Sequence, residues 1–180
     1  MSEQEEIKKE QETDGTKKKS IGGEVWEYVR NFVIVNARIP SESMQNTIMV
    51  GDQIFGNRLA YRFSDPERFD IVIFRYPDDE SQLYIKRIIG LPGETVTIRN
   101  GKVYIDGSET PLDDSFCPET PSAKGDGVYE VPEGCYFMMG DNRNNSHDSR
   151  FWNNKFVERD KILGKAVLRY WPLNRISLIS

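Results

Sequence analysis

The stretch VTIRNGKVYIDG, residues 96–107, decides the fold class of this chain. Short runs rich in β-branched and aromatic residues flank Asn100-Gly101 on both sides. An Asn-Gly pair between two alternating runs is the strongest short-range signal for a β-hairpin, because both residues tolerate the positive φ angles of the tight turn. Asp106-Gly107 marks another tight turn directly afterwards. The stretch therefore predicts a pair of antiparallel strands.

Similar short runs recur from Phe32 onward and predict further strands. These runs are FVIV (32–35), DIVIFRY (70–76), YIKRIIG (84–90), CYFMM (135–139) and KAVLRY (165–170). Only two short helices are expected, near residues 24–31 and 156–162. Residues 107–134 are rich in Pro, Gly, Ser and Asp, which indicates a long surface excursion. The expected fold class is mainly β, with barrel-like antiparallel sheets.

The amino-terminal residues differ from the rest of the chain. Residues 1–20 hold one large aliphatic residue, Ile7, among mixed charges, and this apolar content is too small to offset the entropy of ordering. We therefore expect a disordered charged tail over residues 1–23. The 180-residue chain is too short for two ordinary domains, so one folded domain is expected over residues 24–180.

Composition argues against several functional classes. The net charge of −5 comes without a basic stripe, so no nucleic-acid partner is expected. The single histidine, His147, and the lack of a Gly-rich phosphate loop predict no metal and no cofactor. Cys117 and Cys135 lack metal-ligand spacing. They form either one disulfide in an oxidising compartment or two free thiols.

A hydroxyl nucleophile needs a base to take its proton. His147 adjoins both Ser146 and Asp148. Neighbours in an extended segment point to opposite faces, so these three residues do not form a triad with one another. A serine hydrolase built from this sequence would instead use a lysine as its base.

The segment IPSESMQNTIMVGD (39–52) supplies a candidate serine. Pro40 fixes the backbone at its start, and an extended Ser41-Glu42-Ser43 would put both hydroxyls on one face. This arrangement suits a nucleophile at one serine and an oxyanion donor at the other, with the Ser43 N–H as second donor. Considered alone, Ser-x-Ser also fits an ordinary loop.

The run YIKRIIG (84–90) supplies a candidate lysine. Strand alternation puts Tyr84, Lys86 and Ile88 on one face. An unperturbed lysine has a pKa of about 10.4, and burial against apolar neighbours lowers it towards the neutral form that a base requires. The alternative is an edge-strand lysine that reaches solvent.

A third segment, GDNRNNSHDSR (140–150), is dense in hydrogen-bonding side chains directly after an apolar strand. It fits a connection rich in Asx-turns. Its charged side chains could also form a rigid ion-pair network. In addition, the hydroxyl of Ser146 could orient a buried amine. The charged residues are Asp141, Arg143, Asp148 and Arg150.

These segments, followed by ILGKAVLRYWP (162–172), resemble in type and order the successive sequence boxes of bacterial type I signal peptidases. The resemblance runs from about Phe32 to Pro172. It implies a serine endopeptidase of mainly β fold that removes amino-terminal signal peptides from exported preproteins by a Ser–Lys dyad. It also implies a place at the bacterial cell membrane, with the catalytic domain on the extracytoplasmic face, and no metal or organic cofactor.

The resemblance assigns roles to individual residues. Ser43 matches the nucleophile and Lys86 the general base, while Ser41 and the Ser43 N–H match the oxyanion hole. Ser146 matches the serine that positions the lysine, and the supporting ion pairs would be Asp148 with Arg150 and Asp141 with Arg87. The family's preference for small residues before the cut implies shallow apolar pockets, for which the candidates are Ile39, Met44 and Ile88. Asn46 stands where the family often has a proline.

The membrane contact is expected to be peripheral. A spanning helix needs about 20 largely apolar residues, whereas Glu24, Glu27 and Arg30 interrupt the segment between Lys19 and Arg38. Either a span was removed, or the natural protein lacks one, and the chain as given is expected to be soluble or peripheral. The candidates for contact with the membrane surface are Trp26, Tyr28, Phe32 and Ile34.

Two rival functions fit parts of the same pattern. Self-cleaving Ser–Lys peptidases of the SOS-repressor type also place a Ser-Met element before a strand lysine, but they carry a DNA-binding helical domain or a cleavable linker. A non-catalytic β-barrel module that grips signal peptides would share the fold. The presence of both Ser43 and Lys86 favours an active enzyme.

Overall fold

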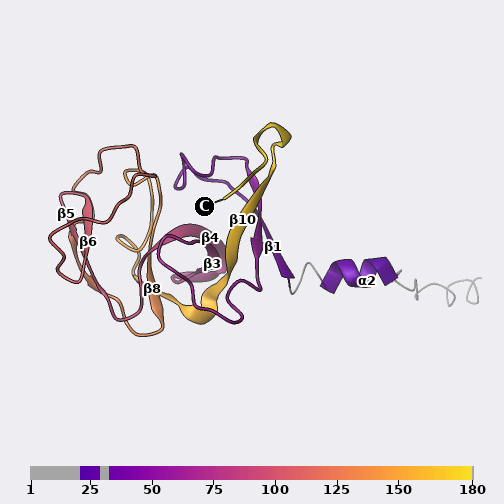
Figure 1. The fold of residues 1–180 in the computed structure, drawn as a ribbon, viewed down its shortest axis with the longest axis horizontal. Helices are drawn as coiled ribbons and strands as arrows, with labels where there is room; N and C mark the ends of the chain where they lie inside the picture. The colour runs from indigo at the N-terminus through magenta and orange to yellow at the C-terminus, as the bar shows by residue number, and fades with distance from the viewer. Residues whose placement is uncertain (1–20, 29–32, 180) are drawn as a thin grey trace, which may run out of the picture.

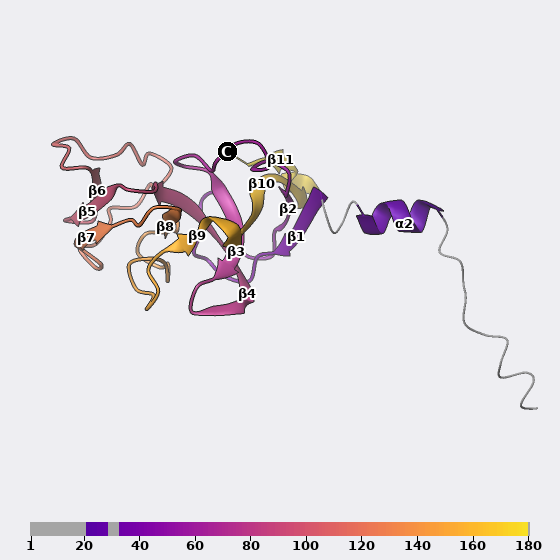
Figure 2. The same cartoon turned by 90° about the horizontal axis from the view of Figure 1, so that it is seen from below.

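The computed structural model describes residues 21–28 and 33–179. Figures 1 and 2 show the strands gathered in one body and the helix α2 (Ile21–Tyr28) standing apart from it. The predicted tail over residues 1–20 lies outside the described residues, and residues 21–23 form the first turn of α2 rather than part of a tail. None of the helices in the described ranges has the length and apolar character needed to cross a membrane.

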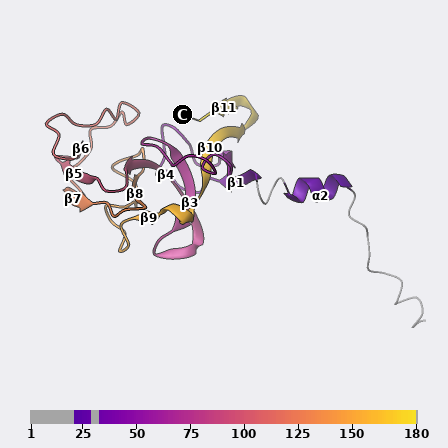
Figure 3. The same cartoon turned by 60° about the horizontal axis from the view of Figure 1, so that its bottom comes forward.

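Two antiparallel sheets make up the body (Figure 3). The main sheet has the strand order β1-β2-β10-β3-β4-β8-β9, with β11 paired to β10, and the smaller sheet has the order β6-β5-β7. The strands are β1 (Ile34–Arg38), β2 (Gln53–Asn57), β3 (Ile71–Tyr76), β4 (Asp79–Gly90), β5 (Thr95–Arg99), β6 (Lys102–Ile105), β7 (Gly127–Glu130), β8 (Cys135–Met139), β9 (Val157–Glu158), β10 (Ile162–Trp171) and β11 (Ser177–Leu178). The predicted mainly β fold with antiparallel sheets is therefore confirmed. The strand order of the main sheet is an open path that begins at β1 and ends at β9.

The hairpin predicted from residues 96–107 is present. β5 and β6 pair antiparallel, with Arg99 opposite Lys102. Asn100 and Gly101 take φ angles of 53° and 73°, as the two-residue turn requires. The turn at 106–107 likewise has two positive φ angles, 49° and 74°.

The helix expected over residues 156–162 is wrong. This segment instead contains the short strand β9 and a single 3₁₀ turn, η2 (Arg159–Lys161). Val157 pairs with Tyr136 of β8, and its side chain is completely buried. Pairing along the sheet edge and burial of this valine outweigh the local helical preference of the charged residues that follow.

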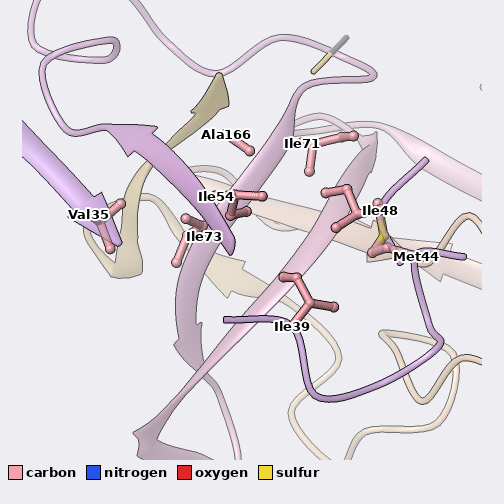
Figure 4. Packing of buried hydrophobic residues seen from close by; sticks show 8 residues of the cluster. All are labelled: Val35, Ile39, Met44, Ile48, Ile54, Ile71, Ile73 and Ala166. Carbon is pink, nitrogen blue, oxygen red and sulfur yellow. The ribbon is translucent and has the colours of Figure 1, made fainter. Parts of the chain in front are cut away.

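Three clusters of buried side chains form the core. One joins the two sheets, because Ile89 of β4, Val96 of β5 and Phe137 of β8 pack in it together. Another, shown in Figure 4, lies between β1, β2, β3 and the segment that follows β1. Met44 and Ile48 of that segment are both completely buried in this cluster. The core thus fixes the position of the segment that carries the candidate nucleophile.

Candidate active site

The segment around Ser43 is a compact turn rather than the extended run expected from the sequence. The Gln45 N–H donates to the Glu42 carbonyl at 2.9 Å, and the Ile48 N–H donates to the Met44 carbonyl at 2.8 Å. Asn46 has a φ of 90°, which asparagine tolerates better than most residues and which the ring of a proline forbids. The asparagine that departs from the family pattern is therefore suited to the backbone found here.

Lys86 lies in the middle of β4 and is only 4% exposed. Its Nζ is 2.6 Å from Ser43 Oγ and 3.1 Å from the Ile85 carbonyl oxygen. On the same strand face, Ile88 belongs to a core cluster and the partly buried Tyr84 packs against it. Nζ lies 5.4 Å from the centre of the Tyr84 ring. Two segments separated by more than forty residues thus bring a hydroxyl and an amine into direct contact.

Burial lowers the pKa of Lys86 to about 8, even though the carboxylates of Asp148 and Asp141 act to raise it. Desolvation disfavours the charged ammonium and is the dominant cause. A substantial fraction of the amine is therefore neutral near pH 8, and a neutral amine can accept the proton of the adjacent hydroxyl.

The Ser41 hydroxyl lies 3.4 Å from Ser43 Oγ. The two hydroxyls are neighbours, as expected, although a turn and not strand alternation brings them together. Ser41 is exposed, whereas Ser43 is buried. A hydroxyl at this position is free to turn towards a group bound beside Ser43.

Ser146 is 7% exposed, and its hydroxyl has no hydrogen-bond partner among the described residues. It packs against Gly140, where an added Cβ would lie 2.3 Å from both Ser146 Oγ and the Ser43 carbonyl oxygen. Gly140 thus lets the Ser146 hydroxyl and the nucleophile segment approach each other closely. The hydrogen bond to Lys86 that the resemblance implies is not formed here.

Two buried ion pairs hold the segment 140–150. Arg87 donates to both carboxylate oxygens of Asp141, at 2.9 and 2.8 Å. Arg150 donates to both carboxylate oxygens of Asp148, each at 2.8 Å. Bidentate pairs of this kind fix orientation as well as neutralise charge. The same carboxylates accept hydrogen bonds from the Thr47 hydroxyl and from the Gly140 N–H, respectively.

Arg143, the other arginine of this segment, pairs with a different part of the chain. Its guanidinium donates to Asp114 of the surface excursion at 2.7 Å. Arg143 is 3% exposed, so it connects the excursion to the segment 140–150 through a largely buried contact. The network expected from the four charged residues of the segment therefore extends to the 107–134 region.

A cleft of about 470 Å³ opens beside Ser43 and Lys86. Its walls come from the nucleophile segment, from β4 and from the loop after β8, and consist of Pro40, Ser41, Glu42, Ser43, Gln82, Leu83, Tyr84, Ile85, Lys86, Asn145 and His147. The three residues proposed from the sequence as pocket lining are elsewhere: Ile39, Met44 and Ile88 are 2%, 0% and 0% exposed and belong to the core clusters. The β4 residues Leu83, Tyr84 and Ile85 line the cleft instead, which alternation along one strand did not indicate.

His147 lines the cleft and contacts the rings of Tyr76 and Phe151. Its Nε2 is 3.5 Å from the Tyr76 hydroxyl. Across residues 21–28 and 33–179, no three His, Cys, Asp or Glu side chains gather as metal ligands would. Cys117 and Cys135 are both free thiols, so the bridge considered as one alternative is not formed.

Comparison with known proteins gives consistent matches. The family model described as signal peptidase, peptidase S26, matches residues 25–171. The chain is 41% identical over 157 residues to a probable signal peptidase I-2 of Synechocystis, covering 84% of this chain and 70% of that protein. It is 40% identical over 156 residues to the signal peptidase I of Leptolyngbya laminosa, covering 82% and 74%. With the signal peptidase I of Bacillus caldolyticus it shares 32% identity over 182 residues, covering 90% and 98%.

The buried ion pair between Arg87 and Asp141 is expected to contribute to the free energy of unfolding. The Asp141→Asn substitution leaves a buried guanidinium opposite a neutral amide, and we expect it to lower the free energy of unfolding by about 3–5 kcal/mol. Asp65→Asn is the matched control, because Asp65 pairs with Arg159 while 86% exposed; its effect should stay below about 1 kcal/mol. Urea denaturation at pH 7 measures both. Equal losses in the two variants would contradict the prediction.

Proposed function

The chain belongs to the signal peptidase family, peptidase S26, and from that membership we propose that it removes amino-terminal signal peptides from exported preproteins. It is a serine peptidase. The observation that best supports the proposal is the contact of 2.6 Å between Lys86 Nζ and Ser43 Oγ, made where both side chains are buried at the wall of a cleft.

In the proposed first step, neutral Lys86 takes the proton of Ser43 as the Ser43 oxygen attacks the carbonyl carbon before the scissile bond. The carbonyl oxygen becomes an oxyanion, which the Ser43 N–H and the Ser41 hydroxyl stabilise as donors. The protonated Lys86 then gives its proton to the departing amine, and the peptide bond breaks. The signal peptide remains attached to Ser43 as an ester.

In the second step, Lys86 is neutral again and takes a proton from a water molecule. The resulting hydroxide attacks the ester carbonyl, and the same two donors hold the second oxyanion. The Ser43 oxygen departs with the proton from Lys86, which restores the starting state. This lysine acts as base and acid in turn, so one side chain carries every proton transfer of the proposed reaction.

The sheet edge beside the dyad suits an extended substrate. β8 pairs with β4 only from Arg87 onward, so Leu83 to Ile85 have β3 on one side and no described strand on the other. A peptide that adds to this free edge would gain backbone hydrogen bonds while its alternate side chains point into the cleft. We propose that Leu83, Tyr84 and Ile85 limit the size of those side chains and so favour small residues before the cut.

We assign the Ser146 hydroxyl the task of orienting the neutral amine of Lys86 during turnover. Its burial, its lack of a competing partner in the described part of the chain and its approach to the Ser43 carbonyl beside Gly140 support this role.

The proposed location is the extracytoplasmic face of a bacterial cell membrane, with the membrane surface as a partner. Exposed apolar side chains at the end of β10 and in the segment after it support surface contact: Trp171, Leu173, Ile176 and Leu178.

The earlier candidates for membrane contact contribute less to this proposal. Trp26 and Tyr28 belong to α2, but their side chains lie outside the described part, as does the whole of Phe32. Ile34 belongs to β1 and is partly buried. The apolar surface at the end of β10 and in the segment after it is therefore the better supported point of contact.

Substitution of the dyad tests the proposed function. Ser43→Ala and Lys86→Met should each lower kcat on a signal-peptide-bearing precursor on the order of 10⁴-fold or more, and the double variant should lose little beyond that, because the two residues act as one unit. Lys86→Arg should be equally inactive, since a guanidinium keeps its proton. Circular dichroism controls for the fold. Substantial turnover by Lys86→Met at neutral pH would rule out the proposed base.

The pH profile tests the protonation state of Lys86. Below its pKa of about 8 the amine is charged and cannot act as base, so kcat/KM should rise with pH through this range and level off on the alkaline side. His147→Ala should leave the profile unchanged. A collapse of activity in that variant, or a rising limb centred near pH 6, would make the histidine the base.

Ser146→Ala tests the orienting hydroxyl. Because geometry rather than binding is affected, we expect kcat to fall by about 10- to 100-fold while KM stays close to that of the wild type. Rates at saturating substrate on the folded variant measure this. A turn residue without a catalytic task would instead give a small loss of stability and near-normal kinetics.

A further inference from the structure

Asn142 makes two hydrogen bonds to the nucleophile segment, one on each side of Ser43. Its side-chain Nδ2 donates to the Glu42 carbonyl oxygen at 3.1 Å. Its backbone N–H donates to the Ser43 carbonyl oxygen, also at 3.1 Å. Asn142 itself is buried, with 5% of its surface exposed, although Glu42 is exposed. One residue therefore holds the two peptide groups that flank the α-carbon of Ser43.

The bond to the Glu42 carbonyl has a consequence for the Ser43 N–H, because both belong to the same peptide group. In a trans peptide the C=O and the N–H point in opposite directions and lie in one plane. Fixing the carbonyl against Asn142 therefore fixes the direction of the N–H. Among the described residues the Ser43 N–H has no acceptor, so it is available to a bound group.

Asn142 is itself held in place by its neighbours. Its carbonyl accepts a hydrogen bond from the Asn145 N–H at 3.0 Å. The preceding residue, Asp141, is paired with Arg87, which follows Lys86 in β4. The base and the peptide group before the nucleophile are thus tied to the same buried network.

We propose that Asn142 is a positioning residue that aims the Ser43 N–H at the oxyanion. This inference rests on the proposed function, in which that N–H is one of the two oxyanion donors. Asn142 touches neither the substrate nor the reacting atoms. Its task is to prevent rotation of the Glu42–Ser43 peptide group as negative charge develops on the substrate oxygen, so that the donor is already oriented in the free enzyme.

The Asn142→Asp variant removes the donor while keeping the size of the side chain. A carboxylate has only acceptors, so it repels the Glu42 carbonyl and favours rotation of the peptide group. Asn144→Asp is the matched control two residues away. Asn144 also donates through Nδ2 to a backbone carbonyl, at 3.1 Å, but that carbonyl belongs to Thr120 in the surface excursion.

The test compares two inhibitors with the same peptide sequence ending in alanine, one an aldehyde and one the corresponding amide. Ser43 Oγ adds to the aldehyde carbon, its proton passes to Lys86, and the aldehyde oxygen becomes an oxyanion that needs the donors. The amide occupies the cleft without this charge. Wild type and Ser43→Ala are measured first, and the proposed function itself fails if Ser43→Ala binds the aldehyde as tightly as the wild type does.

With that established, Asn142→Asp should weaken aldehyde binding about 10- to 100-fold and lower kcat by a similar factor, with amide binding and KM nearly unchanged. Asn144→Asp should leave all four values at wild-type level. Asn142→Ala, which removes the donor without adding charge, should show the same split and serves if the aspartate variant does not fold. Equal weakening of aldehyde and amide, or unchanged aldehyde binding in a folded Asn142 variant, would overturn the assignment.

Discussion

A lysine amine buried beside a serine hydroxyl is the constraint on which the rest of the structure depends. Burial must be deep enough to lower the pKa of Lys86, yet the segment that surrounds it contains two carboxylates that raise it. Each of these, Asp141 and Asp148, forms a bidentate pair with an arginine. Lys86 therefore faces two nearly neutral ion pairs rather than two negative charges, and desolvation remains the larger effect.

The ion pairs also give the site its geometry. Three segments far apart in the sequence meet here: the turn after β1, the middle of β4 and the loop after β8. Apolar packing of Met44 and Ile48 fixes the depth of the turn, but packing is non-directional. The directional contacts come from the loop after β8, through the Thr47 bond to Asp141 and the two bonds of Asn142. The hydrophobic core thus fixes the position of the turn that carries Ser43, and these hydrogen bonds fix its orientation.

Much of the fold and the catalytic pair could be predicted from the sequence. The predictions succeeded where the local sequence pattern agreed with the position of the residue in the folded chain. The hairpin at Asn100-Gly101 needed only its turn residues, and Ser43 and Lys86, selected from motifs, lie in contact. β2 escaped notice because Gly56 interrupts its pattern; a Cβ there would lie 2.6 Å from Val35, so tertiary packing required the glycine. The cleft lining was missed for a similar reason, since Ile39 and Met44 look alike in sequence whether they face a cleft or the core. The significance of Asn142 depends on a hydrogen bond from its side chain to a backbone carbonyl a hundred residues away, which no local pattern reveals.

The burial of Met44 immediately after Ser43 ties catalytic competence to the integrity of the whole domain. Most surface turns open by themselves at little cost, and their amides exchange with solvent without global unfolding. Here, opening the turn would draw Met44 and Ile48 out of a cluster that includes strands β1, β2 and β3. We therefore expect local opening of this turn to be rare, so that activity on heating is lost together with the fold and not before it.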